Sequence, residues 1–94
     1  MKVRVKFMGI AQVPRGFEAQ REVPMDFPGN SLEDLFQQLF SGMDSESRRI
    51  LFTEQGEISP YLAIVVNGIA VFYSKGFNPP LKEGDLIELI SACG

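Results

Sequence analysis

The last four residues, 91–94, contain the two groups of this chain that are best suited to take part in a reaction, the Cys93 thiol and the Gly94 carboxylate. Glycine has no side chain, so its carboxylate can enter a narrow channel and be activated there by a partner protein. A chain used in this way is a carrier and not an enzyme. A frayed terminus without any role is the alternative, and Gly94 taken alone favours it.

Cys93 is the only cysteine of the chain. Its thiol could attack an activated Gly94 or form a mixed disulfide with a partner. Thiols react as thiolates, and no basic residue adjoins Cys93 to favour that form, so we expect an ordinary exposed residue. One cysteine excludes a disulfide or a four-cysteine metal cluster within the chain, and the absence of histidine removes the commonest general base. We therefore expect no self-contained catalysis and no intrinsic metal or cofactor.

Length and composition predict one folded domain over residues 1–94, ending in a short tail at 91–94. The chain is 45% hydrophobic and 22% charged, which is ordinary for globular proteins and far from the composition of disordered chains. No apolar run approaches the roughly 20 residues that a membrane-spanning helix needs, and the first residues alternate in polarity, unlike a signal peptide. The sequence predicts a cytoplasmic protein that does not bind membranes.

Charge is distributed unevenly, although the net charge is only −3. Residues 1–24 carry five basic and two acidic side chains, whereas residues 25–60 carry two basic and seven acidic ones. Lys2, Arg4 and Lys6 alternate with apolar residues, so they share one face of a strand. They are candidates for binding phosphate, RNA or an acidic partner, but a pI near 4.8 argues against nucleic acid. We expect a solvated strand face.

The elements that must position this tail follow from periodicity. Apolar alternation predicts strands at 2–10 and 17–27, joined by a turn. Apolar residues at helical spacing begin at Leu32 and predict a helix that ends near Gly42. Ser31 is its expected N-cap, and Asp34 stands at the capping-box position. Asp44 is expected to cap a second short helix that reaches residue 51, and 53–57 is predicted to be a loop.

The second half is richer in strands. Residues 62–66 and 69–73 flank Asn67 and Gly68, a pair typical of a two-residue hairpin turn, and 86–90 is a final apolar strand. Tyr61 and Tyr73 are expected to complete the hydrophobic layer. The order β-β-α-β-β-β describes a two-layer α+β domain, and a β-grasp architecture satisfies it: a mixed sheet of about four or five strands with one main helix on one face and a short second helical segment.

Two segments in this order, LAIVVNG at 62–68 and PLKEGDLIELI at 80–90, resemble the ThiS/MoaD family of ubiquitin-like sulfur carriers. The resemblance extends over nearly the whole chain. It implies that an adenylating enzyme uses ATP to activate the terminal glycine, Gly94, which becomes a thiocarboxylate. It further implies that the sulfur passes to a synthase subunit in molybdopterin, thiazole or cysteine synthesis, and that the partner-binding residues are Ser91, Ala92, Cys93 and Gly94.

The chain departs from the family pattern at two points. Cys93 replaces the penultimate glycine of the family's Gly-Gly end. The tail, counted from Gly84 and Asp85, is about two residues shorter, which reduces its extended reach by roughly 7 Å. Our leading hypothesis is a sulfur carrier that resembles the small subunit of molybdopterin synthase. The alternatives are a β-grasp interaction module that has lost the tail chemistry and, least expected, a nucleic-acid-binding domain.

Overall fold

The structure, a computed structural model, describes residues 1–9, 13–73 and 79–91 of the chain. Within these residues the chain forms five strands and two helices: β1 (Lys2–Met8), β2 (Val23–Asp26), α1 (Leu32–Gly42), α2 (Ser45–Leu51), β3 (Leu62–Val66), β4 (Ile69–Val71) and β5 (Leu86–Ser91).

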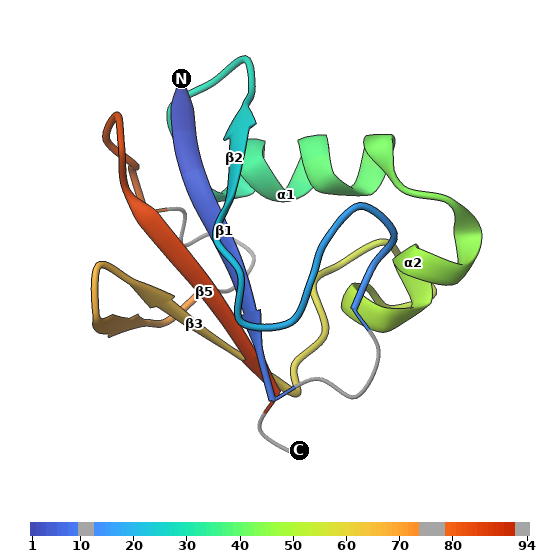
Figure 1. The fold of residues 1–94 in the computed structure, drawn as a ribbon. Helices are drawn as coiled ribbons and strands as arrows, with labels where there is room; N and C mark the ends of the chain where they lie inside the picture. The colour runs from blue at the N-terminus through green and yellow to red at the C-terminus, as the bar shows by residue number, and fades with distance from the viewer. Residues whose placement is uncertain (10–12, 74–78, 92–94) are drawn as a thin grey trace.

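The strands form one mixed sheet in the order β2-β1-β5-β3-β4. β1 and β5 run parallel at its centre, and the other neighbouring pairs are antiparallel. Both helices lie on the same side of this sheet (Figure 1). A mixed five-stranded sheet with one main helix and a short second helix confirms the predicted β-grasp architecture. β5 therefore enters the middle of the sheet and carries the chain toward residue 92.

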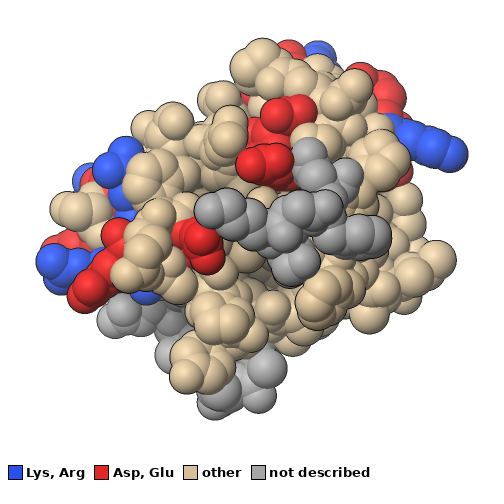
Figure 2. Space-filling view, turned by 180° about the vertical axis from the view of Figure 1, so that it is seen from behind, with Lys and Arg blue, Asp and Glu red and all other residues tan. Residues whose placement is uncertain are grey.

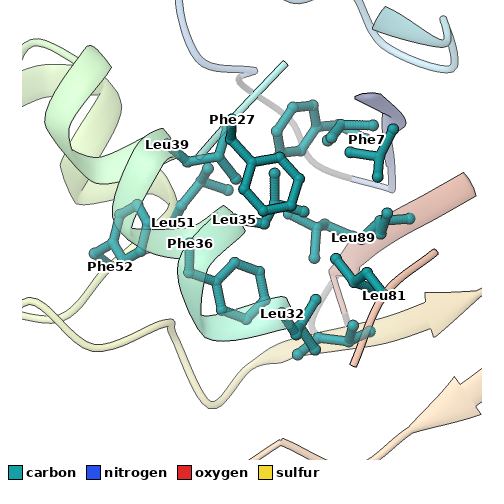
Figure 3. Close-up of a cluster of buried hydrophobic side chains, with 14 of the residues drawn as sticks. Phe7, Phe27, Leu32, Leu35, Phe36, Leu39, Leu51, Phe52, Leu81 and Leu89 are labelled. Carbon is teal, nitrogen blue, oxygen red and sulfur yellow. The ribbon is translucent and has the colours of Figure 1, made fainter. Parts of the chain in front are cut away.

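The core lies between the sheet and α1. Alternate residues of β1 and β5 face the helices, and the helical stripe predicted from the sequence faces the sheet (Figure 3). The buried hydrophobic residues form one cluster: Val3, Val5, Phe7, Phe27, Leu32, Leu35, Phe36, Leu39, Met43, Leu51, Phe52, Ile64, Leu81, Ile87 and Leu89. The prediction of a core-forming stripe is thereby confirmed.

Both helix starts agree with the sequence. The Ser31 side chain accepts a hydrogen bond from the Asp34 backbone N–H at 3.3 Å, and the Asp34 carboxylate accepts one from the Asn30 N–H at 3.1 Å. Asp44 caps α2 by accepting from the Ser47 N–H at 2.9 Å. These hydrogen bonds satisfy N–H groups that have no partner within the helix, which fixes where each helix begins.

The second predicted strand, 17–27, is wrong in extent. Only Val23–Asp26 pairs with β1. Gln20 adopts a positive φ of 64°, which interrupts extended backbone, and before it Ala19 forms only an isolated bridge with Phe7. The apolar residue Phe17 packs edge-on against Phe7, with ring centroids 4.7 Å apart, and it does so from a loop. Apolar alternation at Phe17 and Ala19 therefore occurs without strand pairing: Phe17 is partly buried and Ala19 is exposed.

Three smaller expectations also change. β1 ends at Met8, before residue 10, and Gly9 has a φ of 67°. β4 ends at Val71, although the sequence predicted pairing through Tyr73. Tyr73 joins the hydrophobic layer by packing edge-on against Phe36, whereas Tyr61 is 65% exposed and does not.

The two turns that carry the family resemblance are linked by hydrogen bonds. The Asn67 side chain donates from Nδ2 to Oδ1 of Asp85 and accepts from the Leu86 N–H, each at 2.9 Å. Oδ2 of Asp85 accepts from the Lys82 N–H at 2.8 Å. Asn67 has a φ of 51°, a left-handed conformation that asparagine tolerates better than most residues. The residues of both motifs therefore have a structural role, which is to join the β3–β4 hairpin to the turn before β5.

Candidate functional site

The sheet face that points away from the helices is partly apolar, and we call it the outer sheet face. Val5 of β1 and Ile87 and Leu89 of β5 are buried against the helices. Because side chains alternate along a strand, their neighbours in β1 and β5 face the other side of the sheet. Cross-strand pairing continues this face into β3. Its apolar members are at least partly exposed: Met8, Ala63, Val65, Leu86 and Ile90.

The outer sheet face has its apolar residues concentrated near the end of β5. Met8 lies opposite Ile90 in the parallel pair, and Ile90 lies opposite Ala63 in the antiparallel pair. Phe72 follows β4 and is 75% exposed. Neighbouring apolar residues that are at least partly exposed make this surface a candidate protein interaction site. Sequence analysis missed this surface, although the uninterrupted apolar run of β3 was a signal for apolar residues on both faces.

The predicted basic stripe lies on the same outer sheet face, with acidic neighbours beside it. Arg4 forms an ion pair with Glu22 at 2.8 Å and also donates to the Gly84 carbonyl at 3.1 Å. Lys6 lies opposite Glu88 in the β1–β5 pair. These acidic neighbours offset the positive charge of Arg4 and Lys6. The basic residues therefore resemble the solvated strand face expected from the sequence.

The predicted site residues lie at the end of a central strand. Ser91 is the last residue of β5, where its backbone pairs in register with Leu62 of β3. Ser91, which was predicted to be the first residue of the tail, is therefore part of the strand. Ala92, Cys93 and Gly94 lie outside the described residues. Since β5 is held by β1 on one side and β3 on the other, any chain that continues from Ser91 leaves from a fixed point beside the apolar part of the outer sheet face.

On the helix side of the sheet, a groove of about 970 Å³ lies between α1, the 52–60 loop, β3 and β4. Among its described lining residues are Phe36, Phe40 and Tyr73, together with Glu33 and Glu57. Burial raises the pKa of the Tyr73 phenol, and the negative charges of Glu33 and Glu57 raise it further. The groove thus combines aromatic side chains with two carboxylates, and the Arg48 guanidinium lies over the Phe40 ring, 4.3 Å from its centroid.

Other chemistry is sparse in the part of the chain that the structure describes. No group of three or more histidine, cysteine, aspartate or glutamate residues there is arranged to hold a metal ion. No described helix has the length and apolarity to span a membrane.

No protein-family profile matches the chain, and a comparison with curated proteins finds no significant sequence relative. Among solved structures, the chain resembles Urm1 from Trypanosoma brucei, with a TM-score of 0.69. The alignment covers 96% of this chain and 90% of that one at 24% sequence identity. The chain has a ubiquitin-like fold. At this identity the likeness concerns the fold, so the function must be argued from the chain's own residues.

Proposed function

We propose that the chain is a sulfur-carrier protein whose Gly94 carboxylate is adenylated and then converted to a thiocarboxylate. The partners are an adenylating enzyme, which uses ATP, and a synthase subunit that accepts the sulfur in cofactor biosynthesis. The resemblance of 62–68 and 80–90 to the ThiS/MoaD family supports this proposal, and so does the ubiquitin-like fold, since the family consists of ubiquitin-like carriers. By the same resemblance, the recipient is a molybdopterin-synthase-like subunit.

The chemistry requires little from the carrier itself. The Gly94 carboxylate attacks the α-phosphorus of ATP and releases pyrophosphate, which leaves an acyl adenylate. A hydrosulfide ion, HS⁻, supplied by a sulfur donor, then attacks the carbonyl carbon. AMP departs with the electron pair of the bond that breaks, and loss of the sulfur-bound proton leaves the Gly94 thiocarboxylate. Because a carboxylate is a poor electrophile and an acyl adenylate has a good leaving group, the partner's activation step makes the substitution feasible. The carrier has only to present its terminal carboxylate in the partner's active site.

One observation carries the proposal, namely that β5 ends beside the apolar part of the outer sheet face. A partner that binds Met8, Ala63 and Ile90 sits next to the point where the chain leaves Ser91. Binding at this surface brings Ser91, where β5 ends, close to the partner, which lowers the entropic cost of bringing the terminal carboxylate to an active site.

Cys93 stands at the family's penultimate glycine, and substitutions there test its effect. A glycine at this position removes a side chain from the predicted channel, so Cys93→Gly is expected to raise the rate of activation. Cys93→Ser keeps a similar size without the thiol, and we expect it to behave like the unaltered chain. A thiol that takes part in sulfur transfer would instead make Cys93→Ser inactive.

The test is ATP–pyrophosphate exchange catalysed by the adenylating enzyme from the same source, measured with and without this chain. The proposal predicts exchange that requires the chain and is lost when Gly94 is deleted. Ile90→Lys on the outer sheet face should weaken exchange, whereas Gln37→Lys, which adds the same charge on α1, should not. Binding without exchange, unaffected by Gly94 deletion, would instead identify an interaction module without tail chemistry.

A further inference from the structure

The two edges of the sheet differ in how well they are protected against pairing with another chain. β2 carries Pro24, which lacks an N–H group, and Asp26, which is charged. β4 has neither feature: Ile69 is 70% exposed, Ala70 is exposed, and neither is charged. Natural sheets blunt their edges with proline or charge, so an apolar edge without them is a candidate for strand addition.

Within the described residues, the outward backbone groups of β4 pair with no other strand. Val66 and Ile69 flank the two-residue turn and pair in register, and Ala70 lies opposite Val65. In an antiparallel pair the hydrogen-bonded and non-hydrogen-bonded positions alternate, and the pair next to a two-residue turn is hydrogen-bonded. The N–H and C=O of Ala70 therefore point away from β3, and in the described part of the chain β3 is the sheet neighbour of β4.

The groove next to this edge indicates what the partner strand must contain. β4 is only three residues long, so backbone pairing alone gives few hydrogen bonds, and side chains must supply additional affinity. The groove offers Phe40 and Tyr73, which are partly exposed, to apolar side chains, and the exposed Glu57 to a cation. None of its described lining residues is lysine or arginine. Figure 2 shows acidic atoms both near the middle of the visible face and at its edges, where basic atoms also lie.

We propose that the β4 edge and the adjoining groove bind an extended peptide segment in which apolar and basic residues alternate. The segment adds to the sheet as a strand next to β4, and its basic side chains reach Glu57. A second copy of this chain is a poorer occupant, because pairing two β4 edges brings two acidic grooves together and supplies no cation from either strand. This binding site is independent of the tail, so the inference extends the proposed function without depending on it.

The probes are synthetic peptides of about eight residues, slightly longer than an average strand, in which valine alternates with lysine or, as the matched control, with glutamate. Binding is followed by amide chemical shifts of the full chain. The proposal predicts that the lysine peptide binds with shifts concentrated at β4, residues 69–71, and at Glu57, and that the glutamate peptide does not bind. Glu57→Lys should weaken binding at least about tenfold, whereas Glu54→Lys, the same change outside the groove, should not.

A second pair of variants tests the strand addition. Ala70→Pro removes the outward N–H without removing a bond to β3, so the domain should fold but lose the peptide. Ala70→Thr keeps the N–H and favours extended backbone, so binding should persist. The proposal is overturned if both peptides bind equally, if neither binds, if the shifts map to the outer sheet face, or if the chain dimerises through β4 instead. ATP–pyrophosphate exchange should be unchanged in Glu57→Lys and Ala70→Pro. A failure of the peptide-binding proposal can therefore be distinguished from a failure of the proposed carrier function.

Discussion

Asn67 joins the β3–β4 turn to the turn before β5, and its replacement by alanine tests whether this link stabilises the fold. The side chain makes two hydrogen bonds, to Asp85 and from the N–H of Leu86, both at 2.9 Å. Each contributes about 1 kcal/mol net. Alanine also loses the tolerance of asparagine for a φ of 51°, which costs about 1 kcal/mol more. Asn67→Ala should therefore lower the free energy of unfolding by about 2–3 kcal/mol.

The assay is thermal unfolding followed by circular dichroism, combined with urea titration. For a domain of this size, that loss lowers Tm by roughly 10–20 °C. Asn67→Gly is the matched control, because glycine accepts a positive φ but makes neither hydrogen bond, so it should recover about 1 kcal/mol relative to alanine. A double-mutant cycle with Asp85→Ala should give a coupling of about 1 kcal/mol. A change below about 0.5 kcal/mol in Asn67→Ala, or strict additivity with Asp85→Ala, would refute the reasoning.

Three further predictions concern the core, a glycine and acid stability. Leu35→Ala should cost about 3 kcal/mol by urea titration, because Leu35 is fully buried, and a loss below about 1 kcal/mol would contradict the core assignment. Gly29→Ala should destabilise strongly, since a Cβ there would lie 2.5 Å from the Asp34 carboxylate at a φ of 144°, whereas Gly42→Ala has open space and should be neutral or slightly stabilising. Hydrogen bonds from Asn30 and Ser31 lower the pKa of Asp34 in the folded state below its ordinary value of 3.8. The ionised carboxylate therefore stabilises the fold above pH 3.8, and this contribution is lost as the pH falls through the pKa of the folded state. Asp34→Asn should flatten the acid side of a plot of Tm against pH, and an unchanged slope would contradict this.

The sequence was sufficient to predict the elements whose signals are local. The helix cap at Ser31, the hairpin turn at Asn67 and the strand at 86–90 each depend on neighbouring residues, and the structure confirms them. The strand predicted at 17–27 was wrong in extent, because Phe17 packs from a loop against Phe7, which is distant in sequence, and Ala19 forms only an isolated bridge. Periodicity alone does not distinguish a loop that buries single residues from a paired strand.

The surfaces were harder to predict than the fold. The basic residues Lys2, Arg4 and Lys6 do share a face, but their acidic neighbours come from other strands and turns, which only the tertiary structure brings together. The outer sheet face likewise combines three strands whose order in the sheet differs from their order in the chain. The chemical role of Gly94 remains a prediction from the sequence, because residues 92–94 lie outside those that the structure describes.

Intact mass spectrometry tests the carrier function most directly. The chain is incubated with ATP, a sulfur donor and the adenylating enzyme from the same source, beside a variant that lacks Gly94. The account predicts a mass gain equal to the replacement of one carboxylate oxygen by sulfur in the full chain, localised to Gly94 by fragmentation, and no gain in the variant. An unchanged mass in the full chain, when the same enzyme preparation is shown to activate another carrier protein, would contradict the account.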